Sequence, residues 1–216
     1  TKIIGKWHLG DQPPFFPTRH GFESYFGLPY SNDMLPDHPA NDRFNFPPLP
    51  LMRDEKVIHV DPNQASLTDH YTREAVQYIR EHKDEPFFLY MAHMYVHVPI
   101  YAPFRHLAKS QNGPYGAAVE HLDECTGRIL DTLAECGIDE RTLVIFTSDN
   151  GGIVREKGSN APLRGGKAST WEGGLREPCI MRWPGEIPAG QICREVATAM
   201  DFLPTLVRLA GGEPPA

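Results

Sequence analysis

Residues 143–152 read Leu-Val-Ile-Phe-Thr-Ser-Asp-Asn-Gly-Gly. The apolar residues at the start of this stretch are mostly β-branched or aromatic, which predicts a core strand buried on both faces. Asp149 and Asn150 end the strand, and the two glycines after them let the backbone turn sharply. We therefore expect a carboxylate and an amide oxygen at the carboxyl end of a core strand, where open α/β sheets bind ligands.

Asp149 and Asn150 fit two interpretations. Carboxylate and amide oxygens are hard donors of the kind that holds Ca²⁺ or Mg²⁺, which indicates a metal site. Asp-Asn-Gly is also common turn chemistry, so an Asx turn explains the same residues without any metal. The stretch alone leaves both interpretations open, and the choice between them depends on residues elsewhere in the chain.

The chain outside this stretch alternates predicted strands with predicted helices. Besides a strand that ends near Gly5, we expect strands at 87–91, 143–148 and 179–183, and helices at 68–82, 115–136 and 201–209. This alternation predicts βαβ units, and with them an α/β fold in which helices flank a mostly parallel central sheet.

Residues 11–66 show no sustained periodicity. The region is rich in aromatic residues, and ten of the chain's 21 prolines lie in its first 62 residues. We expect a long ordered loop region here, within a single partial domain that covers residues 1–216.

Composition excludes several classes of protein. The 216 residues suffice for one sizeable core, and the formal net charge of −7 argues against a protein that binds nucleic-acid backbones. No apolar run approaches the ~20 residues of a membrane-spanning helix. The first residues, Thr-Lys-Ile-Ile, lack the basic and apolar regions of a signal peptide.

The four cysteines, at positions 125, 136, 179 and 193, show no zinc-binding spacing. We expect four buried thiols. A disulfide between Cys179 and Cys193 requires that the Pro-Gly segment between them folds back.

Three clusters of potential cations follow predicted strands. Lys6 and His8 alternate in an extended strand, so they are expected to share a face. His93 and His97 follow the strand at 87–91, where an imidazole can act as a general acid or a hydrogen-bond donor. Lys167 lies between two Gly-Gly pairs, which let backbone pass close to a ligand.

Each cluster alone also fits an ordinary strand end or surface loop, and the Lys167 loop lacks the Walker A spacing. Their shared location is more specific, because all of them, with Asp149 and Asn150, follow segments expected to end at one edge of one sheet. A cation site beside lysines and histidines predicts a pocket for a tetrahedral oxyanion ester. Six further histidines, at 20, 59, 70, 82, 106 and 121, have no supporting context.

Five motifs in order make the sequence resemble the sulfatase family, in its group of arylsulfatase A and N-acetylgalactosamine-6-sulfatase. They are Gly-Lys-Trp-His-Leu-Gly at 5–10 and the segments 27–33, 147–151, 166–178 and 201–206. The resemblance extends over nearly the whole chain. It implies an alkaline-phosphatase-like α/β fold and the hydrolysis of a sulfate ester, on either a small molecule or a glycan.

The resemblance also implies roles for the basic residues. Lys6 and Lys167 would hold sulfate oxygens and offset charge in the transition state. His8 would orient the hydroxyl of the nucleophile. His97 would lie on the leaving-group side as a hydrogen-bond donor or general acid, whereas His93 is at a position where the family varies.

By the same resemblance, Asp149 and Asn150 would ligate an active-site Ca²⁺, or Mg²⁺ in its place. Sulfatases use a formylglycine made from the first residue of a Cys/Ser-x-Pro/Ala-x-Arg motif, and no such motif occurs among these 216 residues. The family's adjacent pair of metal-binding aspartates and its small C-terminal subdomain are not seen either. We therefore expect an internal fragment of a sulfatase that is inactive alone, from a lysosomal, periplasmic or secreted parent.

Two other functions remain open from the sequence. One is the hydrolysis of phosphate or phosphonate esters, which related members of the superfamily carry out. The other is binding alone, in a sulfatase-like protein without a nucleophile. The sequence leaves the oligomeric state undetermined.

Overall fold

The computed structural model describes residues 1–153 and 158–214. Its strands form two sheets, in the orders β4-β3-β2-β1-β5 and β6-β7. The strands are β1 (Lys2–Lys6), β2 (Ser24–Leu28), β3 (Pro50–Arg53), β4 (Lys56–Val60), β5 (Leu89–Ala92), β6 (Val144–Thr147) and β7 (Cys179–Arg182).

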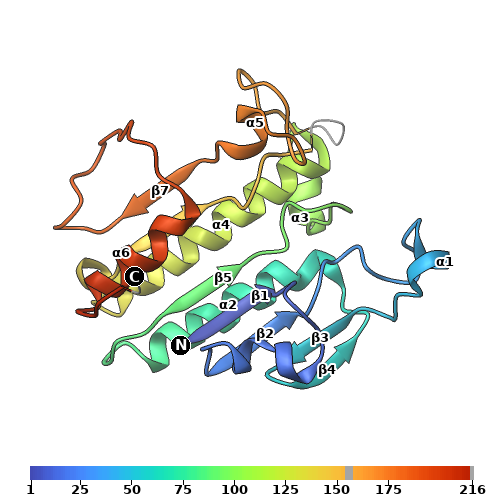
Figure 1. Cartoon of the computed structure of the whole chain (residues 1–216), viewed down its shortest axis with the longest axis horizontal. Coiled ribbons are helices and arrows are strands. Elements are labelled where there is room, and N and C mark those ends of the chain that lie inside the picture. The colour runs from blue at the N-terminus through green and yellow to red at the C-terminus, as the bar shows by residue number, and fades with distance from the viewer. Residues whose placement is uncertain (154–157, 215–216) are drawn as a thin grey trace.

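One long helix, α2, lies against the larger sheet, and a second, α4, lies beside it (Figure 1). Helix α2 packs on β1, β2 and β5, and α4 packs on α2. The helices are α1 (Asn41–Phe44), α2 (Leu67–Glu81), α3 (Phe104–Leu107), α4 (Gly113–Glu135), α5 (Glu172–Leu175) and α6 (Phe202–Leu209). Short 3₁₀ turns occupy Pro13–Phe15, Pro17–Arg19, Gln64–Ser66, Asp139–Arg141 and Ala199–Asp201.

The larger sheet is mixed. Strand β1 pairs in parallel with β2 on one side and with β5 on the other. Strands β3 and β4 extend the sheet beyond β2 as an antiparallel hairpin. Because β1, β2 and β5 run in the same direction, their carboxyl ends lie at one edge, which is where the candidate site forms.

Strand β1 is buried on both faces. Ile4 packs against Leu67 and Tyr71 of α2, in the larger of the core clusters. Ile3 points to the opposite side and packs against Phe16 and Tyr25. Both isoleucines are fully buried, as expected for the centre of a parallel sheet.

The expectation of a long loop over residues 11–66 is wrong. The region contains β2, β3 and β4, which make up three of the five strands of the larger sheet. These strands are only four or five residues long, and β2 is buried along nearly its whole length, so it shows no alternation of apolar and polar residues. The prolines hid them further, since Pro50 itself begins β3.

The expectation that 143–148 is a strand buried on both faces is also wrong. The strand exists as β6, but it pairs antiparallel with β7 in a separate sheet. Its residues are half-buried or exposed, with Phe146 39% exposed. Within the described residues β6 has a partner strand on one edge only, and an apolar run cannot reveal how many strands will cover it.

The four cysteines are free thiols. Cys125 is buried and Cys136 is half-buried, whereas Cys179 and Cys193 are exposed. The expectation of four buried thiols is therefore wrong for the last two, because β7 is exposed along most of its length and the segment that follows is open to solvent.

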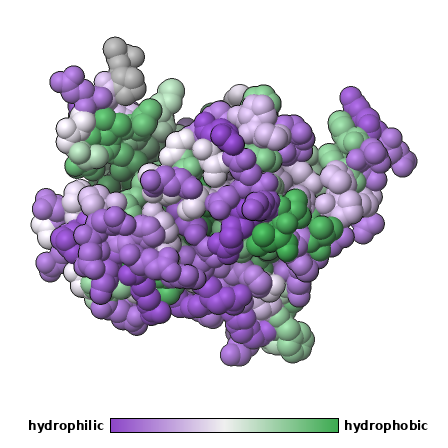
Figure 2. Space-filling model, turned by 90° about the horizontal axis from the view of Figure 1, so that it is seen from below, coloured by the Kyte–Doolittle hydropathy of each residue, from purple (hydrophilic) through white to green (hydrophobic). Residues whose placement is uncertain are grey.

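The face seen from the side of β3 and β4 is mostly hydrophilic, with apolar residues gathered in separate patches (Figure 2). The edge strand β4 exposes the apolar side chains Val57, Ile58 and Val60. None of the helices in the described part of the chain has the length and apolar character needed to cross a membrane.

A partly buried carboxylate on α2 forms ion pairs with two strands of the larger sheet. Glu74 of α2 accepts hydrogen bonds from Lys2 of β1 at 2.6 Å and from both terminal nitrogens of Arg53 of β3 at 2.6 and 2.9 Å. Burial by itself would raise the pKa of Glu74, but the hydrogen bonds from Arg53 and Lys2 outweigh it and lower the pKa to about 2.

Replacing Glu74 by glutamine is expected to lower the free energy of unfolding of the full-length protein by about 2 to 3 kcal/mol at pH 7. Because the folded-state pKa is depressed, the stabilisation is full above the unfolded pKa near 4.5 and disappears as pH falls toward about 2.

Thermal unfolding at several pH values measures this difference. Glu81→Gln is the matched control, since Glu81 is exposed on the same helix and should change stability by less than about 0.5 kcal/mol. Equal effects of the two substitutions, or a Glu74→Gln effect that persists below pH 2, would contradict the prediction.

Candidate active site

The candidate site forms where the three parallel strands of the larger sheet end (Figure 1). Strand β1 ends at Lys6, β2 is followed by Ser31, Asn32 and Asp33, and β5 is followed by the loop that carries His97. The sequence predicted that all the candidate residues follow strands of one sheet. This holds for Lys6, His8 and His97 but not for Asp149, which follows β6 of the second sheet.

Lys6 and His8 are held beside the end of β2. The Trp7 N–H donates to the Leu28 carbonyl at 2.9 Å, and the His8 N–H donates to the Pro29 carbonyl at 3.0 Å. His8 has a left-handed backbone with φ of 63°. Lys6 and His8 are therefore not related by strand alternation as expected, since β1 ends at Lys6 and the chain turns at His8.

His97 has one ring nitrogen already engaged. Its Nδ1 lies 2.6 Å from the Val98 carbonyl oxygen and 3.4 Å from Ser31 Oγ. A carbonyl only accepts, so we assign the proton to Nδ1, which leaves Nε2 with a lone pair in the neutral ring. Donation of a proton from Nε2 then requires the imidazolium form.

The loop of Lys167 is tied to the loop after Asp149 and Asn150. The Asn160 amide donates to the carbonyls of Gly152 and Gly165 at 2.9 and 3.1 Å, and its oxygen accepts from the Gly152 N–H at 3.0 Å. The Lys167 N–H also donates to the Gly152 carbonyl. Asn160 thereby fixes the position of Lys167 relative to Asp149 and Asn150.

The glycines around these loops allow a close approach of two backbones. The Gly151 N–H donates to the Gly174 carbonyl, and a Cβ on Gly151 would lie 1.8 Å from the Gly173 carbonyl oxygen. Any side chain at position 151 would therefore push the loop after Asn150 away from α5. This contact explains why glycine pairs occur in both segments.

The charges of the candidate residues act on one another. Burial lowers the pKa of Lys6; the nearby Lys167 lowers it further, and Asp149 and Asp33 oppose the shift. Burial and then the charge of Lys6 lower the pKa of His8. Residues from four separate segments therefore lie within the range of each other's charge.

His97 belongs to the same group of charges. Burial lowers its pKa, and the positive charge of Lys167 lowers it further, whereas the hydrogen bond to Val98 and the charge of Asp33 raise it. The structure thus brings Lys6, His8, His97 and Lys167 together as the sequence suggested, and it places Asp149 close to Lys6.

A family model described as Sulfatase matches residues 1–212. The chain belongs to the sulfatase family. It is similar over its full length to N-acetylgalactosamine-6-sulfatase of Rattus norvegicus, with 41% identity, and to arylsulfatase A of Homo sapiens, with 35% identity. It covers 43% and 46% of those proteins, so it spans less than half the length of these relatives.

The crystal structure of the PsFucS1 sulfatase from Pseudoalteromonas sp. is similar in fold, with a TM-score of 0.88 and 28% sequence identity. The similarity covers 98% of this chain and 48% of that one. These findings confirm the family resemblance and the alkaline-phosphatase-like α/β fold predicted from the sequence.

Asp149 and Asn150 provide donors that suit a hard cation in this sulfatase-family chain. The nearby Glu177 has one carboxylate oxygen that is buried and has no hydrogen-bond partner among the described residues. Burial and the charge of Asp149 raise the pKa of Glu177. The carboxylates of Asp149 and Glu177 and the amide of Asn150 are oxygen donors, and one Glu177 oxygen has no partner among the described residues. This donor set fits Ca²⁺ or Mg²⁺.

Sequence reasoning missed three residues that lie near the candidate site. Asp33 acts on the pKa of Lys6, His8 and His97, and one of its oxygens is buried with no partner among the described residues. Ser31 approaches His97, and Asn160 holds the Lys167 loop. Ser31 and Asp33 follow β2, a strand that the sequence did not predict. The only local sign of these two residues was the polar run that follows Gly-Leu-Pro.

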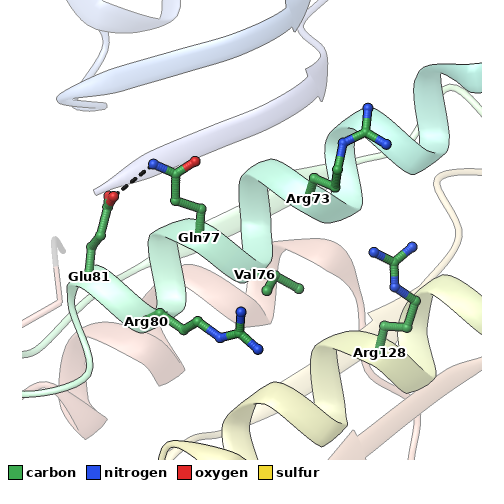
Figure 3. Close-up of a pocket in the computed structure, with 6 residues that line it drawn as sticks. All are labelled: Arg73, Val76, Gln77, Arg80, Glu81 and Arg128. Atoms are coloured by element: carbon green, nitrogen blue, oxygen red, sulfur yellow. Dashed lines mark hydrogen bonds between the residues drawn. The ribbon is translucent and has the colours of Figure 1, made fainter.

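A surface groove between α2 and α4 lies apart from this site (Figure 3). It contains none of the six residues predicted from the sequence, and we assign it no part in the reaction of the family. Its lining residues are Arg73, Val76, Gln77, Arg80, Glu81 and Arg128.

Proposed function

We propose that the complete protein is a sulfuric ester hydrolase in which this chain supplies the residues that bind the sulfate group. The observation that supports this most strongly is the convergence of two lysines and two histidines with Asp149 in a chain of the sulfatase family. The substrate class is a sulfate ester of a sugar or of an aryl alcohol.

Lys6 and Lys167 are proposed to hold the sulfate oxygens. A sulfate monoester carries a negative charge on its non-bridging oxygens, and further charge develops on the bridging oxygen as the ester bond breaks. Fixed cations in a partly buried pocket stabilise this charge more strongly than water does, because they need no reorganisation during the reaction. Asn160 and the Gly152 carbonyl keep the Lys167 loop in place for this.

His97 is proposed to serve the leaving group. With Nδ1 bonded to the Val98 carbonyl, Nε2 of the imidazolium can donate a proton to the departing oxygen. Because the pKa of His97 is lowered, this role favours acidic conditions, in which more of the ring is protonated. His8 is proposed to orient the hydroxyl of the nucleophile.

Asp149 and Asn150 are proposed to hold Ca²⁺, or Mg²⁺ in its place. The cation would supply positive charge next to the sulfate oxygens. The donor types and the unsatisfied oxygen of Glu177 support this proposal. We further propose that a formylglycine from a part of the protein outside these 216 residues provides the nucleophile, so this chain alone is expected to be inactive.

Paired assays on an aryl sulfate and the matching aryl phosphate test the proposed function. The full-length protein is expected to show the higher kcat/KM on the sulfate, and to lose activity after removal of divalent cations and regain it with Ca²⁺. The 216-residue chain is expected to be inactive on both esters.

Faster turnover of the phosphate would show a phosphoesterase built on the same cations. Absence of turnover of either ester by full-length protein that contains formylglycine would favour a binding protein. Robust sulfate turnover by the 216-residue chain would contradict the proposed source of the nucleophile.

A further inference from the structure

A second polar cluster lies outside the candidate active site, where α2 packs on α4. A carboxylate oxygen of Asp69, a ring nitrogen of His121 and the sulfur of Cys125 all lie within 4.8 Å of one another. His121 and Cys125 are fully buried, and the side chain of Asp69 is 17% exposed. Three donors of different chemistry thus face each other in the interior of the described structure.

The helices account for this arrangement. His121 and Cys125 are four residues apart on α4, so they lie on the same face. Asp69 belongs to the first turn of α2. The two helices run alongside one another, and further along the pair Arg128 of α4 lies opposite Arg73 and Arg80 of α2 (Figure 3).

One ring nitrogen of His121 has no partner among its protein neighbours. Nδ1 makes no hydrogen bond within the described residues, whereas Nε2 lies 3.2 Å from Asp69 Oδ1, within reach of that carboxylate. The rings of Tyr95 and His106 pack beside it, with centroid distances of 5.8 and 4.8 Å. A buried polar nitrogen without a hydrogen-bond partner is uncommon in proteins, and a ligand bound at this cluster would explain it.

We propose that Asp69, His121 and Cys125 form a binding site for a divalent transition metal of the zinc class. A thiolate, an imidazole and a carboxylate are the ligand types that Zn²⁺ takes in proteins, whereas Ca²⁺ and Mg²⁺ prefer oxygen donors. Binding releases the thiol proton of Cys125 to solvent and forms a metal–sulfur bond. The two anionic ligands then balance the charge of the dication.

The surroundings fit a metal site with an open fourth position. Arg105 donates from both terminal nitrogens to the Asp69 carboxylate, at 3.0 and 3.1 Å, so it can orient that ligand from outside. The side chains of Arg105 and Asp69 are 46% and 17% exposed. An ion can therefore approach the cluster from solvent on the side of Asp69. A water molecule would complete the four ligands.

The proposed metal would link α2 to α4, and Tyr95, which packs on His121, belongs to the loop that carries His97. The site is separate from Asp149 and Asn150, so its occupancy can be measured without an activity assay.

Cobalt substitution tests the proposal. The full-length protein, reduced, stripped of metals and saturated with Ca²⁺ to occupy the site at Asp149, is titrated with Co²⁺. We expect one equivalent to give thiolate-to-cobalt charge-transfer absorption that Zn²⁺ removes. The absorption should be lost in Cys125→Ser and His121→Gln, and Asp69→Asn should weaken metal binding at least about tenfold.

Cys136→Ser is the matched control, because Cys136 follows the end of the same helix and should leave the absorption unchanged. Folded wild-type protein without the absorption, or a Cys125→Ser variant that retains it, would overturn the proposal. If Cys125→Ser does not fold, X-ray absorption at the zinc edge of the wild type decides. One sulfur at ~2.3 Å is expected, and a shell of oxygen and nitrogen alone would refute the site.

Discussion

Replacing Lys6 by alanine is expected to lower kcat/KM of the full-length protein on an aryl sulfate by about 100- to 1000-fold, the usual cost of removing one preorganised charge donor. Lys6 ends the central strand β1, is about half-buried, and lies within range of the charges of Asp149 and Lys167. The backbone of Lys6 is held in the sheet by the pairing of β1 with β2.

Lys56→Ala is the control for this measurement, because Lys56 is an exposed lysine on β4, at the far edge of the same sheet. It should leave kcat/KM unchanged. Circular dichroism must show that Lys6→Ala is folded. A folded variant with activity within about threefold of the wild type would contradict the role proposed for Lys6.

Replacing Gly5 by alanine is expected to destabilise the protein by about 4 kcal/mol or more, which is exceptional for a single substitution. A Cβ at this position would lie 1.9 Å from the Ala92 carbonyl oxygen of the neighbouring strand. The backbone at Gly5 also has φ of 117°, which an alanine rarely adopts. To relieve the clash with Ala92 or the backbone strain, β1 would have to move away from β5 next to Lys6.

Gly127→Ala is the matched control. Gly127 lies inside α4, and a Cβ there would meet nothing within 4 Å. This substitution should stabilise the helix by about 0.5 to 1 kcal/mol. Chemical or thermal unfolding of both variants gives the comparison, and a Gly5→Ala variant within about 1 kcal/mol of the wild type would show that the strands can move apart at little cost.

Periodicity predicted the long helices well. The helix expected at 68–82 is α2 at Leu67–Glu81, and the one expected at 115–136 is α4 at Gly113–Glu135. Each helix repeats its apolar residues over several turns, so the pattern is set locally. The short strands β2, β3 and β4 lack such a repeat. Four or five residues are too few to show a clear alternation of apolar and polar side chains.

The candidate site was predictable in its chemistry but not in its assembly. Lys6, His97 and Lys167 were found because cations next to glycines or strand ends are visible in the sequence. Asp33 and Asn160 were not, because an acidic or amide residue in a loop carries no local signal of what it faces. His121 had no context in the sequence, and only the packing of α4 on α2 placed it beside Asp69.

The sequence by itself determined the family and the kinds of side chain available, because motifs and residue chemistry are local properties of the chain. The tertiary structure decided which of these side chains meet. Lys6 and His97 lie at one edge because β1 and β5 run parallel, and Lys167 joins them through the contacts of Asn160. Asp149 follows a strand of the other sheet, yet it lies near Lys6. Its position depends on long-range packing, which the stretch 143–152 does not encode.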